Sequence, residues 1–292
     1  MVMTATEVVP RHPADLIGQD VLSEDVFSQD VVNQRAWTQP VSVSWLGSLQ
    51  GFTDAGECAA YWRIADGCRN QPILDIGVGL GRTVPLLRSL SEQYVAIDYL
   101  PAMIDAVRRK FPFVDAGVGD ARNLTRFADN SFALVAFSFM GIDAVDHADR
   151  QTVLEEVHRV LRPGGIFWFS TLNKDGRAFR ERPWRPRWPE RVGGSLHHAV
   201  DILHSLKAVP RNWINYARSQ RLRREGEGWA VAPFAAHDFG LIAHYISASQ
   251  QIAELQRHGF KDGVELIDND SGVPVDERRL QDVYAFNVLA RK

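Results

Sequence analysis

A glycine-rich loop is the first part of this chain whose residue types and spacing could do chemistry. Its glycines are Gly77, Gly79 and Gly81, and it follows the short apolar run 72–76. Glycines let the backbone approach a ligand closely, because no side chain intervenes. The position at which a dinucleotide-binding fingerprint has its third glycine is Arg82 in this chain. The loop therefore indicates a nucleotide-like ligand and disfavours a nicotinamide dinucleotide.

Three acidic residues stand near the ends of successive predicted strands. Asp75 lies in the strand before the loop, Asp98 ends the next strand, 21 residues after Gly77, and Asp120 follows the third strand. In open α/β sheets these strand ends border the crevice that binds ligands. Asp98 can accept hydrogen bonds from both ribose hydroxyls of an adenosine, and Asp120 could meet the adenine amino group. A carboxylate at Asp75 suits a cofactor with a positively charged amino-acid end.

Alternating strands and helices are expected to position these residues. Helical patterns separate short apolar runs that predict buried strands. The predicted strands are 72–76, 94–98, 114–118, 132–137 and 166–170. After an interruption, a helix capped by Ser247 and two more strands follow. Such alternation is typical of a doubly wound α/β sheet.

Several of these segments resemble the ordered motifs of class I S-adenosylmethionine-dependent methyltransferases. They are residues 73–83, 94–98, 118–121, 132–137 and 161–165. More narrowly, residues 132–135 with 156–165 resemble the branch that includes many small-molecule methyltransferases. The resemblance covers about residues 73–173. It implies a Rossmann-like sheet of seven strands, of which the last is antiparallel, and the cofactor S-adenosyl-L-methionine with S-adenosyl-L-homocysteine as its product.

The resemblance also implies roles for individual residues near the glycine loop. Gly77, Gly79 and Gly81 would contact the methionine part of the cofactor. Asp98 would bind the ribose, and Asp75 would help to hold the ammonium group. All five belong to the first two predicted strands or to the turn between them.

The resemblance implies roles for five further residues, Tyr99 directly after the second strand and four at the ends of later strands. Asp120 and Ala121 would contact the adenine, and Tyr99 would pack beside the adenosine. Phe137 and Ser138 would lie under the methionine part and the sulfonium, through their backbone carbonyls. The ten residues together form the predicted cofactor site, and no metal site is predicted.

Four parts of the chain are expected from composition. Residues 1–35 are polar and punctuated by proline, which predicts a partly flexible arm. Residues 36–70 are rich in aromatic residues and should form a helical segment that covers the site. The methyltransferase domain would then comprise 71–173 and 246–292. Between its two pieces, residues 174–245 are predicted to form a helical or irregular lid, inserted after the fifth strand.

The predicted lid is basic. Between Lys174 and Gly228 there are 13 Lys or Arg and 6 Asp or Glu residues. Arginine pairs well with carboxylate or phosphate, so the lid suits an acidic substrate, either free or attached to an acidic carrier protein. The alternative is a solvated arginine face on which Trp184 and Trp188 only anchor the loop.

Two other functions remain open at this point. Basic residues interleaved with tryptophans could bind RNA phosphates and bases, which would suit an RNA methyltransferase, although no added RNA-binding module is recognisable. A non-catalytic protein that binds S-adenosylmethionine would need the same cleft as an enzyme. We expect methyl transfer to oxygen, nitrogen or carbon of a small metabolite, in specialised metabolism.

Histidines are the candidates for a catalytic base, because their pKa suits proton transfer near neutral pH. His237, where the insertion returns to the sheet, is the first candidate, and His147, after the fourth strand, is the second. The alternative for either is a helix cap or a surface residue. His237, Asp238 and His244 could instead hold a metal, but their spacing matches no strong ligand pattern.

Overall composition limits the remaining possibilities. The hydrophobic fraction of 45% and the charged fraction of 24% are ordinary for a globular protein. The net charge of −3 gives no overall attraction to nucleic acid or to an anionic membrane. No stretch reaches the roughly 20 apolar residues that span a bilayer. We expect a cytoplasmic monomer or homodimer that has a small-molecule substrate and no membrane partner.

Overall fold

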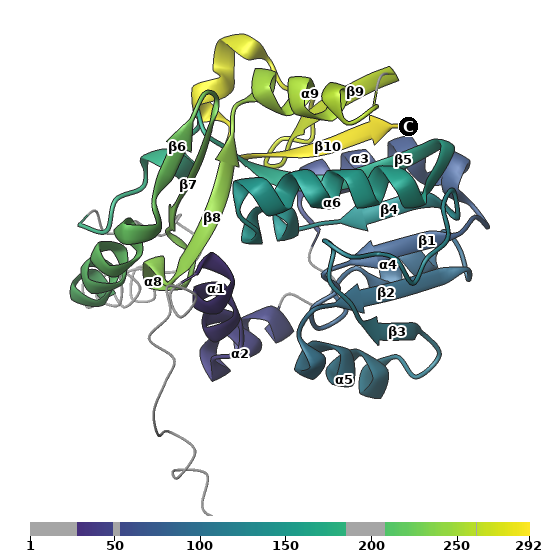
Figure 1. The fold of residues 1–292 in the computed structure, drawn as a ribbon, viewed down its shortest axis with the longest axis horizontal. Helices are drawn as coiled ribbons and strands as arrows, with labels where there is room; N and C mark the ends of the chain where they lie inside the picture. The colour runs from purple at the N-terminus through teal and green to yellow at the C-terminus, as the bar shows by residue number, and fades with distance from the viewer. Residues whose placement is uncertain (1–27, 49–52, 185–207, 261) are drawn as a thin grey trace, which may run out of the picture.

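Ten strands form one mixed sheet in the computed structural model, which describes residues 28–48, 53–184, 208–260 and 262–292 (Figure 1). Most of the predicted flexible arm and residues 185–207 of the predicted lid lie outside these ranges. The strands are β1 Ile73–Ile76, β2 Tyr94–Asp98, β3 Asp115–Val118, β4 Phe132–Phe137, β5 Leu161–Asn173, β6 Arg224–Gly226, β7 Trp229–Phe234, β8 Leu241–Ile246, β9 Asp262–Asp268 and β10 Ala285–Arg291.

Helices cover the sheet and its carboxyl edge. They are α1 Gln29–Trp37, α2 Pro40–Ser48, α3 Ala55–Cys68, α4 Val84–Arg88, α5 Pro101–Lys110, α6 His147–Val160, α8 Ala236–Phe239 and α9 Ala248–Arg257, with further helical turns at η3 Gly141–Ala144, η4 Ala178–Arg180, η5 Gln220–Leu222 and η6 Glu277–Asp282. Residues 208–219 are also helical. In the part of the chain that the structure describes, no helix is both long and apolar enough to cross a bilayer.

The predicted doubly wound sheet is confirmed. Strands β3, β2, β1, β4 and β5 lie side by side in that order and run parallel. On the other edge of β5, β10 pairs antiparallel with both β5 and β9. These seven strands have the predicted arrangement, including the antiparallel last strand.

Three additional strands correct the prediction of a helical or irregular insertion. The antiparallel strands β6, β7 and β8 continue the sheet, and β8 pairs with β5 at Leu172 and Asn173. The pairing of β4 with β5 stops at Phe169. Since β10 occupies the opposite edge of β5 along residues 166–172, β8 takes the edge that β4 leaves. Residues 224–246 therefore belong to the sheet.

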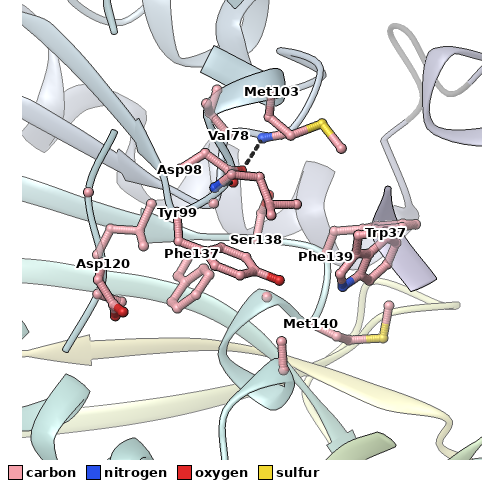
Figure 2. Close-up of a pocket in the computed structure, with 18 of the residues that line it drawn as sticks. Trp37, Val78, Asp98, Tyr99, Met103, Asp120, Phe137, Ser138, Phe139 and Met140 are labelled. Carbon is pink, nitrogen blue, oxygen red and sulfur yellow. Dashed lines mark hydrogen bonds between the residues drawn. The ribbon is translucent and has the colours of Figure 1, made fainter. Parts of the chain in front are cut away.

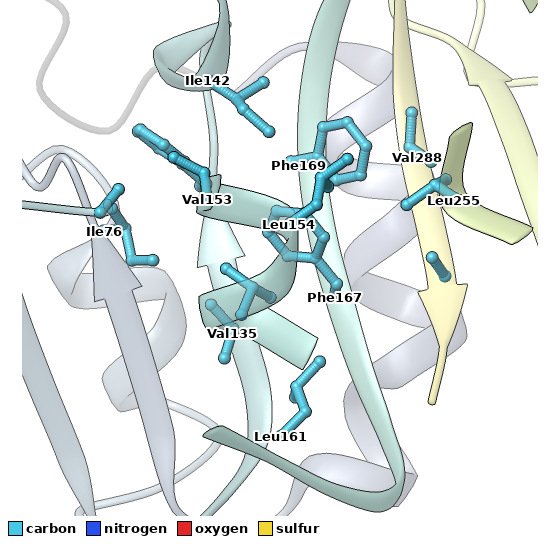
Figure 3. Close-up of a cluster of buried hydrophobic side chains, with 14 of the residues drawn as sticks. Ile76, Val135, Ile142, Val153, Leu154, Leu161, Phe167, Phe169, Leu255 and Val288 are labelled. Carbon is cyan, nitrogen blue, oxygen red and sulfur yellow. The ribbon is translucent and has the colours of Figure 1, made fainter. Parts of the chain in front are cut away.

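Alternation along the central strands divides the hydrophobic core between the two faces of the sheet. Val135 and Phe167 belong to the cluster that packs under α6 and α9 (Figure 3), together with Leu154 and Leu255. Their neighbours along the strands, such as Leu134, belong to the cluster under α3, α4 and α5. Both faces of the parallel strands are thus buried, which explains why the strands are continuous apolar runs.

Side-chain caps set where the main helices begin. Asp54 accepts a hydrogen bond from the backbone of Glu57 at 2.7 Å and starts α3. Asp146 caps α6 in the same way, and Ser247 caps α9 as predicted. Each cap satisfies an amide that has no partner within its helix. The cap at Asp146 also ends the loop that leads from the tip of β4 to α6.

A buried ionic network joins this loop to α6 and α9. Arg150, which is fully buried, donates to Asp143 at 3.1 Å, to Glu254 at 3.0 Å and to Gln251 at 2.7 Å. Asp143 also accepts from the Thr171 hydroxyl at 2.6 Å. Buried charges need such partners, because burial without them is costly. The network therefore holds η3 against β5, next to the site described below.

Candidate functional site

The glycine loop forms the floor of a cavity at the carboxyl edge of the sheet. Gly77 and Gly79 both have positive φ angles, of 67° and 54°. A Cβ on Gly77 would lie 2.8 Å from the Phe137 ring, whereas a Cβ on Gly79 would meet no protein atom within 4 Å. The first glycine therefore allows close packing against β4, and the second leaves its backbone open to the cavity.

Asp98 ends β2 beside this loop. Its carboxylate accepts hydrogen bonds from the backbone amides of Gly79 and Leu100, both at 2.9 Å. The residue is only 5% exposed, and burial raises its pKa. Each carboxylate oxygen has a further lone pair available, so Asp98 can accept hydrogen bonds from two neighbouring hydroxyl groups.

The cavity is elongated, with about 1150 Å³ of empty space. Figure 2 shows Asp120 at one end, Asp98 and Tyr99 between, and Trp37 with Phe139 at the other end. Eight of the ten residues predicted to bind the cofactor line it. They are Gly77, Gly79, Asp98, Tyr99, Asp120, Ala121, Phe137 and Ser138.

The other two predicted cofactor residues do not line the cavity. Asp75 is 1% exposed, and it accepts hydrogen bonds from the hydroxyls of Thr83 and Tyr94, both at 2.6 Å. Burial raises its pKa to about 6. Gly81 packs against Phe111, where a Cβ would lie 2.5 Å from the ring. The structure therefore places both residues behind the loop, where they hold its shape.

Asp120 is engaged by a neighbouring arginine. Arg122 donates two hydrogen bonds to the Asp120 carboxylate from its Nε and a third from Nη2, and its Nη1 contacts Asp30 of α1 and Asp149 of α6. Burial acts to raise the pKa of Asp120, but the bonds from Arg122 outweigh it and lower the pKa. Arg122 thus ties the end of β3 to α1, which closes this end of the cavity.

Arg82 is a cavity residue that the sequence did not single out for binding. Its guanidinium makes two hydrogen bonds of 2.6 Å to Glu57 of α3 and one of 3.0 Å to the Ser138 hydroxyl. It also lies over the Phe139 ring at 4.8 Å. In the sequence, Arg82 was noted only because it stands where a dinucleotide-binding fingerprint has its third glycine. The available signal was an arginine directly after a glycine loop, where it can reach an anionic group of the ligand.

A second cavity, with about 790 Å³ of empty space, adjoins the first. Trp37, Phe139, Met140 and Ala144 line both. Three of these four lie at the end of the first cavity that is opposite Asp120 (Figure 2). The second cavity therefore opens from that end, and its remaining wall is built mainly from β7, β8 and α8.

Two short segments bordering the second cavity have left-handed backbone without glycine. Phe139 and Met140 follow β4 with φ angles of 55° and 60°. His237, Asp238 and Phe239 in α8 have φ angles of 49°, 57° and 60°. Each such residue costs of order 1–3 kcal/mol unless its surroundings enforce it, and such strain gathers at functional sites.

The structure separates the two histidines proposed as bases. His237 lines the second cavity, and its Nδ1 lies 3.0 Å from the Ser42 hydroxyl. His147 lines neither cavity. It stacks on Trp229 with ring centroids 3.8 Å apart, and its Nδ1 lies 3.0 Å from Nε2 of the buried His244. The position of His147 therefore does not support a role as the base.

The described residues do not support the alternative of a metal site at His237, Asp238 and His244. His237 contacts Ser42, whereas His244 contacts His147. Asp238 pairs with Arg211 on the surface. No group of three His, Cys, Asp or Glu side chains with metal-binding geometry occurs among residues 28–48, 53–184, 208–260 and 262–292.

Helix α1 closes both cavities and is held by two amide side chains. Asn33 donates to the carbonyls of Ala144 and Ile242 at 3.0 and 2.8 Å, and its oxygen accepts from the Ile242 amide at 2.9 Å. Gln29 donates to the Ala144 carbonyl at 3.0 Å. The helix therefore bridges η3 and β8, and it brings Trp37 to the shared wall.

Asn33→Ala is expected to loosen α1 by about 2 kcal/mol, because the amide and carbonyl of Ile242 lose buried partners. The amides of α1 should then exchange about 30-fold faster with deuterium while the sheet keeps its protection. Gln34→Ala, at an exposed position on the same helix, is the matched control. Equal exchange in both variants would show that Asn33 does not hold the helix.

Comparisons with known proteins agree with this geometry. Residues 73–165 match the family model of a methyltransferase domain. Over 115 residues, 39% of this chain, the sequence is 31% identical to a probable S-adenosylmethionine-dependent methyltransferase of Mycolicibacterium smegmatis, and the match spans 43% of that relative. Residues 73–165 are a class I S-adenosylmethionine-dependent methyltransferase domain. The chain thus spans less than half the length of that relative.

Two solved structures share the fold of this methyltransferase domain and its surroundings. One is a methyltransferase of Thermotoga maritima described as a possible histamine N-methyltransferase, with 15% identity, a TM-score of 0.53 and coverage of 88% of this chain and 99% of that one. The other is the 1,6-didemethyltoxoflavin N1-methyltransferase of Burkholderia thailandensis, with 12% identity, a TM-score of 0.51 and coverage of 94% and 93%. At these identities the likeness concerns the fold.

The cofactor of the methyltransferase family is S-adenosylmethionine, and the first cavity has residues that suit each of its parts. Asp98 offers a carboxylate for the ribose hydroxyls. The open backbone at Gly79 would leave room for the methionine part, and Arg82, which bonds to Glu57 and Ser138, is a cation that lines the same cavity. When bound, the cofactor would supply an activated methyl group, which Phe137 and Ser138 would face from the end of β4.

Proposed function

We propose that this chain transfers the methyl group of S-adenosylmethionine to a small molecule held in the second cavity, as part of specialised metabolism. The observation that carries the proposal is the wall that the two cavities share. If Asp120 contacts the adenine, as the family resemblance implies, the shared wall lies at the methionine end, where the methyl group would be. A molecule in the second cavity would meet the cofactor there.

The lining of the second cavity favours an uncharged, flat substrate. Trp37, Phe139, Phe234 and Tyr284 contribute aromatic rings. Among the described residues that line it, none is a lysine or an arginine. We therefore propose this class of substrate in place of the acidic metabolite that the basic insertion indicated.

The described arginines of the insertion support this revision. Four of them pair with acidic residues on the surface: Arg177 with Asp270, Arg211 with Asp238, Arg223 with Glu225 and Arg224 with Asp146. Surface pairs of this kind contribute little energy, but they direct these guanidinium groups toward local partners. A solvated basic surface accounts for them without an anionic substrate.

Positioning is the main task of the protein in such a reaction. Holding two reactants in the productive geometry can supply several kcal/mol of barrier reduction. Here η3 and the left-handed turn at Phe139 and Met140 form the boundary between the two reactants, and the buried network around Arg150 keeps that boundary in place.

Ala236→Phe tests whether the second cavity holds the acceptor. Ala236 lines only the second cavity and is partly exposed, so a larger side chain can be accommodated there. We expect transfer from methyl-labelled cofactor to the accepted members of a panel of small aromatic molecules to fall by at least about tenfold. Binding of S-adenosylhomocysteine, followed by calorimetry, should stay unchanged. Ala148→Phe, on the exposed face of α6, is the control.

The same assay separates the alternative functions. Cofactor binding without transfer to any acceptor would favour a non-catalytic binding protein. A salt-dependent shift of labelled RNA, with transfer to RNA that Ala236→Phe does not affect, would favour an RNA methyltransferase. Equal transfer by the Ala236→Phe and Ala148→Phe variants would overturn the assignment of the second cavity.

A further inference from the structure

A serine of α2 contacts the one histidine that lines the second cavity in the described residues. Ser42 is 1% exposed, and its hydroxyl lies 3.0 Å from Nδ1 of His237. Trp37 of α1 also contacts the imidazole, in a T-shaped arrangement with ring centroids 5.1 Å apart. Two residues of the N-terminal helices therefore orient a ring that belongs to the insertion.

The backbone around His237 is held in its unusual conformation by several contacts. The Gly240 amide donates to the His237 carbonyl at 2.9 Å, and Asn215 donates to the Asp238 carbonyl at 3.0 Å. Phe239 is 4% exposed and packs edge-on against Tyr216. A strained segment that is over-determined in this way provides a pre-organised side chain.

We propose that Ser42 is a positioning residue that accepts a hydrogen bond from Nδ1–H of His237, so that Nε2 becomes the acceptor for the proton of a substrate hydroxyl. The inference rests on the proposed function, since it concerns the acceptor molecule in the second cavity. A neutral imidazole has one donor and one acceptor nitrogen, and the partner of Nδ1 decides which is which.

The charged groups near the ring are compatible with a neutral imidazole. Burial lowers the pKa of His237 below its ordinary value of 6.5, and Asp238 only partly opposes this effect. Asp238 itself pairs with Arg211. Asp143 also lines the cavity, but Arg150 and the Leu172 amide, at 2.7 Å, already bond to its carboxylate. His237 can therefore accept a proton near pH 7.

These features indicate a hydroxyl group on a flat, uncharged ring system as the substrate class. A phenol-like hydroxyl has a pKa of about 10, so it gains from a base when it attacks. A carboxylate needs no base and would need a cation, which the described lining lacks. A cationic amine would need a carboxylate with free lone pairs, whereas Asp143 accepts bonds from Arg150, Thr171 and Leu172.

In the transfer step, the substrate oxygen forms the new bond to the methyl carbon. The carbon–sulfur bond breaks, and its electron pair stays on sulfur. The hydroxyl proton moves to Nε2 of His237, and the positive charge of the resulting imidazolium is stabilised by the hydrogen bond from Nδ1–H to Ser42. Product release returns the proton to water.

The first test is the tautomer of His237 in the full chain with S-adenosylhomocysteine bound. Nitrogen chemical shifts of the labelled imidazole should show Nδ1 protonated and Nε2 bare above pH 7 in the wild type. Ser42→Ala should move the ring toward the Nε2–H form, while Ser42→Thr should keep the wild-type form. A wild-type ring protonated at Nε2, or shifts that Ser42→Ala leaves unchanged, would overturn the proposal.

The second test is the pH profile of transfer to a phenolic acceptor. Ser42→Ala should lower kcat by about tenfold with little change in KM, because general-base catalysis depends on alignment. The acidic limb of the pH profile of Ser42→Ala should move to lower pH. Without the Ser42 acceptor the imidazolium of His237 is less stable, so the pKa of His237 falls. Ser42→Thr should restore both properties. Ser44→Ala, at an exposed position of α2, should behave as the wild type.

The two tests separate this inference from the proposed function. If the wild type transfers no methyl group to any hydroxyl but shows the Nδ1–H tautomer, the proposed substrate class fails and the role of Ser42 in orienting the ring stands. If transfer occurs and Ser42→Ala keeps the wild-type kcat and acidic limb, the proposed function stands and the role of Ser42 fails.

Discussion

Replacing Asp98 by alanine is expected to weaken the binding of S-adenosylhomocysteine by at least about 100-fold. The carboxylate would accept hydrogen bonds from two ribose hydroxyls, each with a contribution of about 1.5–3 kcal/mol, and 1.4 kcal/mol corresponds to a tenfold change in affinity. Asp98 is 5% exposed, so water cannot easily replace the lost group. Isothermal titration calorimetry on the full chain measures the effect.

The controls for Asp98 address its second role. The same carboxylate holds the amides of Gly79 and Leu100, so its loss also relaxes the loop. Asp98→Asn keeps the size and one oxygen and should have an intermediate effect, while Asp115→Ala, at an exposed position of β3, should bind normally. Thermal melting of each variant shows whether it is folded. Affinity within about threefold of the wild type in a folded Asp98→Ala would contradict the placement of the ribose.

His237→Asn is expected to reduce methyl transfer by about 100- to 10,000-fold at pH 7, the usual range for loss of a general base. Asparagine tolerates the left-handed backbone at this position, so the substitution removes the base and spares the turn. Because the imidazole must be unprotonated to act, the wild-type rate should rise with pH through a pKa that burial holds below 6.5. This limb should be absent in the variant.

His147→Asn provides the matched comparison. His147 lines neither cavity, so its replacement should leave the transfer rate within about threefold of the wild type and lower only the melting temperature. Both variants should bind S-adenosylhomocysteine normally. If His237→Asn retains more than a tenth of the activity, or if the effects of the two variants are reversed, His237 is not the base.

The parallel sheet and its ligand edge could be predicted because their signals are local. Continuous apolar runs such as 132–137 reflect burial on both faces of the sheet, and Gly77 and Gly79 occupy conformations that disfavour a side chain. Asp98 follows from its place at the end of β2, because parallel strands bring their carboxyl ends to one edge. Each of these signals lies within one strand or directly after it, so little tertiary information was required.

The walls of the second cavity could not be predicted in the same way. Helix α1 is anchored by the side-chain amides of Gln29 and Asn33. A prediction from hydrophobic periodicity places such polar residues on the exposed face of a helix. Strand β8 is an apolar run, but whether it belongs to a lid or to the sheet depends on the free edge that β4 leaves on β5. The left-handed turn at His237 contains no glycine, so the sequence gives no local signal that predicts it.

By itself, the sequence determined the fold of the methyltransferase domain, the family and the cofactor, because backbone geometry and burial within each strand constrain the residues at those positions. Only the tertiary structure decided that Asp75 lies behind the loop, that His147 lies outside both cavities, and that Ser42 reaches His237. Contacts between residues as far apart as Ser42 and His237 arise from how α1, α2 and the added strands pack at the edge of the sheet. The spacing of residues along the chain does not predict that packing.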